Sequence, residues 1–138
     1  MMVNNKKKII LFYIKDSHGG TGRFLQHMYA ALQTDKSYTP IIAVHNTTQG
    51  IKLPAIKIGI NLSKQTGVSF IRFFFHCYNM VALYRFAKKT KPDIIYTLDL
   101  YANITSLILF KYILRWHTPL ISSSHINLTK HIETGRGR

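Results

Sequence analysis

Short apolar runs rich in strand-forming residues alternate along this chain with longer segments of helical periodicity. The apolar runs cover residues 8–14, 39–45, 54–59, 93–98 and 119–125. Runs that are almost continuously apolar are typical of strands covered on both faces. Strands that alternate with helices form βαβ units, in which the strands pair in parallel and the crossovers are right-handed. The alternation therefore predicts an α/β fold, a Rossmann-like open and mostly parallel sheet with helices on both faces.

Three helices are predicted between these strands. The first follows a glycine-rich segment, and its expected inward residues are Phe24, Leu25, Met28 and Leu32. The second covers residues 68–89, with a face spaced by three and four residues that comprises Phe70, Phe73, Phe74, Cys77, Met80, Val81, Tyr84 and Ala87. The third covers residues 101–116, with Leu107, Ile108 and Leu114 on its buried side.

The bulk composition fits one folded domain with a strongly basic surface. The chain has 138 residues, 46% of them hydrophobic and 17% charged, with 19 Lys and Arg against 5 Asp and Glu and a formal charge of +14. Such an excess of cations favours a polyanionic partner: nucleic acid, an anionic membrane surface or phosphorylated small molecules. The basic residues are scattered among apolar ones, which favours a folded basic face over a nucleic-acid-binding arm.

Several classes of protein are excluded by features that the sequence lacks. The single cysteine, Cys77, excludes a disulfide framework and a multi-cysteine metal site. The apolar run near the N-terminus is interrupted by Lys15 and is followed by no small-residue cleavage site, so it does not fit a signal peptide. No segment approaches the roughly 18–20 apolar residues of a membrane span. We therefore expect a cytoplasmic protein.

Polar residues end three of the predicted strands. In an open parallel sheet, ligands bind outside the carboxyl ends of the strands, where the strand order reverses. Residues 16–20, 97–99 and 122–125 occupy these positions after the first, fourth and fifth strands. We therefore expect the three segments to face the same ligand site.

The glycine-rich segment HGGTGR, residues 18–23, lies between the first strand and the first helix. Glycine has no side chain to hold a ligand away, and the N–H groups at a helix start favour an anion. The spacing fits neither the phosphate-binding loop of nucleoside triphosphatases nor the dinucleotide fingerprint. The segment is therefore either a tight turn without a ligand or a site for a phosphate or a cluster of sugar hydroxyls.

Three stretches in register resemble a known family. The chain opens with KKKIILFYI followed by HGGTGRFLQHMYAAL, which resembles the start of a GT-B glycosyltransferase of glycosyltransferase family 4. Further along, KPDIIYTLDLYANITSLIL resembles the family's strand and following helix, and TPLISSSHIN resembles its next strand. The resemblance covers essentially the whole chain. It implies a fold of two Rossmann-like domains, of which the N-terminal one holds the acceptor and the C-terminal one the nucleotide-sugar.

The resemblance also implies roles for individual residues. Gly19 and Gly20 match the glycine pair that lies against the phosphates and sugar of the donor. His125 matches the histidine that helps to position the transferred sugar, and it is the one candidate catalytic residue. Asp99 lies near the expected contacts with a glycan or lipid-linked acceptor. The nucleotide-sugar is a co-substrate, and we expect neither a metal nor another cofactor.

Two further residues beside the glycine pair are candidates on chemical grounds. The departing diphosphate needs stabilisation of its charge, which backbone N–H groups and a cation can supply. Arg23 is the candidate cation for the donor phosphates, with solvated surface as its alternative. His18 is a candidate for the acceptor site, with an ordinary loop position as its alternative. For His125 the alternative is a strand-end histidine that caps a loop.

The chain departs from the family in its length. It stops shortly after the fifth predicted strand, with nothing left to bind the nucleotide. We therefore interpret residues 1–138 as a single, truncated Rossmann-like domain that lacks the C-terminal nucleotide-sugar-binding domain. Such a domain would be inactive alone and would need a separate C-terminal half as a partner.

The basic surface leaves a second class of function open. The second predicted helix mixes aromatic residues with cations, so it packs its aromatics on the sheet or lies at an anionic bilayer. Both hold if only its polar edge meets lipid. The alternative to a glycosyltransferase is thus a non-catalytic basic module that binds an anionic partner, a membrane surface or nucleic acid. No recognised motif supports nucleic acid. A membrane partner would place the protein on the inner face of the cytoplasmic membrane.

Overall fold

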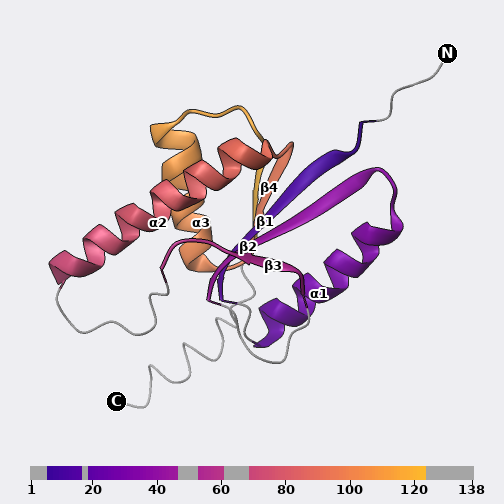
Figure 1. The fold of residues 1–138 in the computed structure, drawn as a ribbon, viewed down its shortest axis with the longest axis horizontal. Helices are drawn as coiled ribbons and strands as arrows, with labels where there is room; N and C mark the ends of the chain where they lie inside the picture. The colour runs from indigo at the N-terminus through magenta and orange to yellow at the C-terminus, as the bar shows by residue number, and fades with distance from the viewer. Residues whose placement is uncertain (1–5, 17–18, 47–52, 61–68, 124–138) are drawn as a thin grey trace.

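Five strands form one parallel sheet in the computed structural model, which describes residues 6–16, 19–46, 53–60 and 69–123. In chain order the elements are β1 (Lys8–Asp16), α1 (Gly19–Thr34), β2 (Tyr38–Asn46), β3 (Ala55–Lys57), α2 (Ser69–Thr90), β4 (Ile94–Thr97), α3 (Leu100–Ser106), η2 (Leu107–Ile113) and β5 (Leu120–Ser122). The strand order is β3-β2-β1-β4-β5, and every neighbouring pair is parallel (Figure 1). The predicted α/β fold, a Rossmann-like open sheet flanked by helices, is confirmed.

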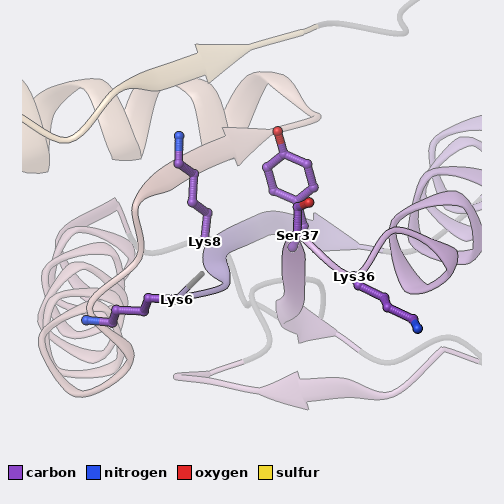
Figure 2. A pocket seen from close by; sticks show the side chains of 5 residues that line it. Lys6, Lys8, Lys36 and Ser37 are labelled. Atoms are coloured by element: carbon purple, nitrogen blue, oxygen red, sulfur yellow. The ribbon is translucent and has the colours of Figure 1, made fainter. Parts of the chain in front are cut away.

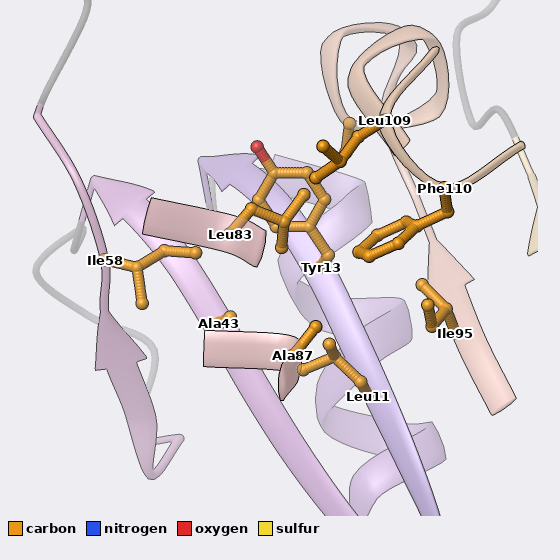
Figure 3. Packing of buried hydrophobic residues seen from close by; sticks show 10 residues of the cluster. Leu11, Tyr13, Ala43, Ile58, Leu83, Ala87, Ile95, Leu109 and Phe110 are labelled. Carbon is orange, nitrogen blue, oxygen red and sulfur yellow. The ribbon is translucent and has the colours of Figure 1, made fainter. Parts of the chain in front are cut away.

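The central strand β1 is covered on both faces. Its residues Leu11, Phe12, Tyr13 and Ile14 are all fully buried. Because side chains alternate along a strand, Leu11 and Tyr13 pack with residues of α2, α3 and η2 (Figure 3). Phe12 and Ile14 point to the other face and pack with α1. This two-sided burial explains why the sequence of β1 is a continuous apolar run.

The first helix packs as its sequence pattern predicts. Leu25 is fully buried, and the other three predicted residues pack against the same cluster on the α1 side of the sheet, namely Phe24, Met28 and Leu32. The glycines lie in a different place from the one expected. Gly19 and Gly20 are the first residues of α1 itself, so the segment after residue 18 is the first helical turn and not a loop.

The buried face of α2 differs from the predicted one, although the bounds agree within one residue. Four of the predicted inward residues are more than half exposed, namely Phe70, Phe73, Phe74 and Val81. The prediction is confirmed for Ala87, which is fully buried, and for Met80 and Tyr84, which pack against the core. Asn79 and Leu83, which were not predicted, are fully buried beside them. Most positions in the first half of α2 are apolar, and phenylalanines occur on more than one side, so spacing alone does not single out one face.

The third predicted helix is two elements with different geometry. After α3 the chain widens into the π-helical segment η2, where the N–H of Leu114 donates to the carbonyl oxygen of Leu109 at 2.9 Å. A wider turn rotates the following side chains relative to an α-helix. Leu107 and Ile108, predicted to be buried, are therefore 45% and 42% exposed, and Leu109 and Phe110 are buried in their place.

Two helical segments end on non-glycine residues with positive φ. Lys91 follows α2 with φ 48°, and Arg115 follows η2 with φ 51°. Beside the second end, the Lys111 ammonium donates to the carbonyl oxygens of Trp116 and Thr118 at 3.2 and 2.6 Å, where a cation suits unpaired carbonyls. Among the described residues, no helix has the length and apolar character needed to cross a bilayer.

Candidate functional site

The polar ends of three strands meet at one end of the sheet, which we call the carboxyl end. Asp16 ends β1, Thr97 ends β4 and Ser122 ends β5, and parallel pairing places all three at this end. From β1 the chain passes through α1 to β2 on one side, whereas β4 lies on the other side of β1. The strand order thus reverses between β1 and β4, which is where open α/β sheets bind ligands.

The glycine pair starts α1 at the carboxyl end. Gly20 is exposed, and a Cβ atom built on it would meet no other atom within 4 Å. The first N–H groups of a helix have no partner within the helix. The backbone around Gly20 is therefore open to approach and is not sealed beneath other atoms.

Asp99 ties the end of β1 to the start of α3. One carboxylate oxygen accepts a hydrogen bond from the backbone N–H of Lys15 at 2.6 Å. The other accepts from the N–H of Ala102 at 2.7 Å, so Asp99 is the N-cap of α3. Each oxygen keeps a second lone pair for another donor. The side chain spans the point where the strand order reverses, and its first role is to hold the two elements together.

A second polar group joins β4, α3 and β5. The Thr97 hydroxyl donates to the Asn103 amide oxygen at 2.6 Å and lies 3.2 Å from the Ser122 hydroxyl. The Asn103 amide nitrogen donates to the carbonyl oxygen of Ser123 at 3.0 Å. These are neutral groups that both donate and accept hydrogen bonds, which is the chemistry that sugar hydroxyls require.

A cation and aromatic rings adjoin this polar group. The Lys15 ammonium lies 5.6 Å from the centre of the Tyr101 ring, within the range of a cation–π contact. The Tyr101 hydroxyl lies 3.2 Å from Nδ1 of His76. Burial raises the pKa of Tyr101 above its ordinary 10.0, so this hydroxyl stays protonated at neutral pH.

Beneath these residues lies a buried histidine–tyrosine pair. His45 is fully buried, and Nδ1 lies 2.7 Å from the carbonyl oxygen of Ile58, which can only accept. Nδ1 therefore carries the proton, and Nε2 accepts from the Tyr13 hydroxyl at 2.5 Å. Burial lowers the pKa of His45 below its ordinary 6.5, and burial also raises that of Tyr13 well above 10.0. Both groups are neutral, and their role is to support the strand ends from within.

The segment after β3 is anchored to this interior by Asn79 of α2. Its amide oxygen accepts from the N–H of Ile60 at 2.7 Å, and its amide nitrogen donates to the Ile60 carbonyl at 3.1 Å. Gly59 turns the chain with φ 65°, and a Cβ atom there would lie 2.2 Å from that amide oxygen. This turn therefore requires glycine.

Four of the predicted site residues lie in the described part of the chain, and two lie outside it. Gly19, Gly20 and Arg23 lie on the first turns of α1, and Asp99 lies between β4 and α3, bonded to the strand that leads into α1. Arg23 is exposed. His18 and His125 lie outside the described residues, so their predicted roles stay predictions.

The described part of the chain holds no group of metal-binding side chains, and a hollow lined by lysines lies at the opposite end of the sheet. Within residues 6–16, 19–46, 53–60 and 69–123, no three His, Cys, Asp or Glu residues are grouped as a metal ion would need. A hollow of about 380 Å³ lies at the amino end of the sheet, lined by Lys6, Lys8, Lys36, Ser37 and Tyr38. Figure 2 shows its three lysine side chains pointing away from one another, so they do not converge on one anion.

Sequence reasoning missed Asn103, Lys15 and Tyr101 at the carboxyl end. Asn103 lies one helical turn after Asp99, and its N–H donates to the Asp99 carbonyl at 2.8 Å, so the spacing from the strand end could have identified it. The Tyr13–His45 pair joins two strands 32 residues apart and leaves no local signal.

The chain was compared with protein-family models, with curated proteins and with solved structures, and none of the three comparisons gave a match.

Proposed function

We propose that this chain is the acceptor-side domain of a glycosyltransferase, which binds a sugar-containing ligand at the carboxyl end of its sheet. The observation that carries the proposal is the open backbone of Gly20, placed at the same end of the sheet as Asp99 and Thr97. The resemblance of the glycine-rich segment and of two later stretches to glycosyltransferase family 4 supports the same conclusion.

The residues have distinct roles in this proposal. The N–H groups of the first turn of α1 and the Arg23 guanidinium stabilise the charge of the departing diphosphate. The absence of a side chain at Gly20 lets the donor phosphates and sugar come close to the backbone. His125 positions the transferred sugar.

In this proposal the acceptor binds beside α3, on the β4 side of the point where the strand order reverses. Asp99 holds α3 against β1 and offers its remaining lone pairs to an acceptor hydroxyl. The acceptor role of His18 stays a prediction. Thr97, Asn103 and Ser122 form the hydrogen-bonded support beneath this contact. In this proposal the nucleotide is held by a second Rossmann-like domain.

Binding measurements with two valine variants test the proposal. The probes are UDP-glucose and GDP-mannose, with uridine diphosphate alone to separate phosphate binding from sugar binding. Gly20→Val places a branched side chain in the open space beside the backbone, and we expect it to weaken binding at least about tenfold, or about 1.4 kcal/mol. Ala31→Val, an exposed change in the same helix, controls for the lower helix propensity of valine.

Equal affinity of the wild-type protein and Gly20→Val for a bound nucleotide-sugar would contradict the role of the glycine pair. Failure of all three probes to bind at millimolar concentration would contradict the proposed donor contacts at the start of α1.

A further inference from the structure

The outward face of α2 changes character along the helix axis. Its first half is apolar, with exposed fractions of 69% for Phe70, 45% for Ile71, 55% for Phe74, 56% for Tyr78 and 53% for Val81. Its second half is basic and comprises the exposed residues Arg85, Lys88 and Lys89. The opposite face, which packs on the sheet, contains Asn79, Leu83 and Ala87. We call the eight exposed residues the outward face.

The apolar half is unusually rich in exposed rings. Phe70 and Phe74 stack edge to face with their centres 4.8 Å apart, and Phe73 lies 6.2 Å from Phe74 while being 61% exposed itself. Scattered exposed apolar residues are common, but a contiguous group of this kind marks a binding surface. In Figure 1 the start of α2 projects beyond the sheet, so no described element covers it.

The charges on α2 select among partners. The helix contains Arg72, Arg85, Lys88 and Lys89 but no aspartate or glutamate. A second copy of the chain would bring more cations to this surface and no carboxylate from the same helix to pair with them. An anionic bilayer satisfies both halves: aromatic rings lie at the depth of the headgroups, and lysine and arginine side chains reach lipid phosphates while their stems contact apolar surface.

We propose that the outward face of α2 is a docking site for an anionic lipid bilayer. The aromatic first half enters the interfacial region, and the basic second half lies against the headgroups. Because α2 packs on the sheet through its other face, the domain docks without unfolding, and α1 lies on the far side of the sheet from the lipid. This docking does not depend on the identity of the ligand at the carboxyl end.

Co-sedimentation with vesicles tests the proposal. One set is pure phosphatidylcholine, and the other contains about 30% phosphatidylglycerol, each at about 50 mM and about 500 mM NaCl. We expect binding to the anionic vesicles, weaker binding at the higher salt concentration, and little binding to the neutral ones. Phe70→Ser/Phe74→Ser should lower the partition coefficient about tenfold or more. Lys88→Gln/Lys89→Gln should lower it mainly at low salt.

Two control variants keep the test specific. Ile121→Ser removes an apolar side chain of β5 that is 45% exposed, as Ile71 is, but that shares a strand face with Tyr96 on the α1 side of the sheet. Lys36→Gln removes an exposed cation at the amino end. Both should bind as the wild-type protein does. Circular dichroism is used to check that every variant is folded.

Three results would overturn the proposal. The first is equal binding by the wild-type protein and Phe70→Ser/Phe74→Ser. The second is equal binding to neutral and anionic vesicles. The third is absence of vesicle binding combined with a dimer in analytical ultracentrifugation that Phe70→Ser/Phe74→Ser abolishes, which would make the outward face a contact between copies of the chain.

Discussion

Replacing Asp99 by alanine should loosen the carboxyl end at the point where the strand order reverses. The side chain makes two bonds of different kinds, one to the N–H of Ala102 at the start of α3 and one to the N–H of Lys15 at the end of β1. Loss of an N-cap side chain costs about 0.5–2 kcal/mol of unfolding free energy. The N–H of Lys15 is half-buried, so its lost partner adds about 1 kcal/mol, the lower end for a buried group. We therefore expect a total loss of about 1.5–3 kcal/mol.

Asparagine at the same position separates the two bonds. Its amide oxygen can cap α3 as well as a carboxylate does, but its amide nitrogen cannot accept a bond from Lys15. Asp99→Asn should therefore cost only about 1 kcal/mol. Urea unfolding followed by circular dichroism gives the free energy of unfolding of the wild-type protein, Asp99→Ala and Asp99→Asn.

Asp93→Ala is the matched control at the other end of the sheet. There an exposed carboxylate accepts one bond from the N–H of Ile9 at 2.7 Å, where water can take its place, so the loss should be smaller than for either Asp99 variant. Equal losses for Asp99→Ala and Asp99→Asn would refute the assignment of two separate bonds.

Three further predictions concern the interior and the end of η2. Burial lowers the pKa of His45, so below pH 6.5 the unfolded chain takes up a proton that the folded chain does not. The free energy of unfolding should therefore be highest above pH 6.5 and fall as the pH drops below it. Urea midpoints should depend less on pH in His45→Gln. Gly59→Ala should lower the free energy of unfolding by roughly 2–4 kcal/mol, because φ is positive there and the new Cβ displaces the Asn79 amide. If that contact is the cause, the double variant Gly59→Ala/Asn79→Ala should lose less stability than the two single variants together. Lys111→Met should cost about 1 kcal/mol in the same assay by removing the two bonds that close η2, and a wild-type midpoint in this variant would contradict that role.

The sheet could be predicted from sequence because burial on two faces leaves a strong signal. The apolar run of β1, the apolar residues 41–44 of β2 and the apolar start of β4 follow directly from the central places of these strands in the sheet. The face of α2 could not be predicted, since phenylalanines occupy both sides of its first half. The widened turn of η2 could not be predicted either, because it depends on how Leu109 and Phe110 reach the core and not on local propensity.

The candidate site was predictable only in part. Polar residues at the ends of β1, β4 and β5 were placed together by the rule for parallel sheets, and the structure bears out that placement for Asp16, Thr97 and Ser122. The bond from Asp99 to Ala102 is a local N-cap, but the bond between Asp99 and Lys15 joins residues 84 positions apart, so no local pattern encodes it. The Tyr13–His45 pair is of the same kind.

A map of backbone amide shifts tests the central claim most directly. The ¹⁵N-labelled chain is titrated with UDP-glucose and with GDP-mannose while the amides at both ends of the sheet are followed. If a sugar donor binds where the strand order reverses, the shifts gather at Gly20, Arg23 and Ala102 and leave Ser37, at the amino end, unchanged. Shifts centred on Ser37 and the lysines around it, with Gly20 silent, would contradict the account.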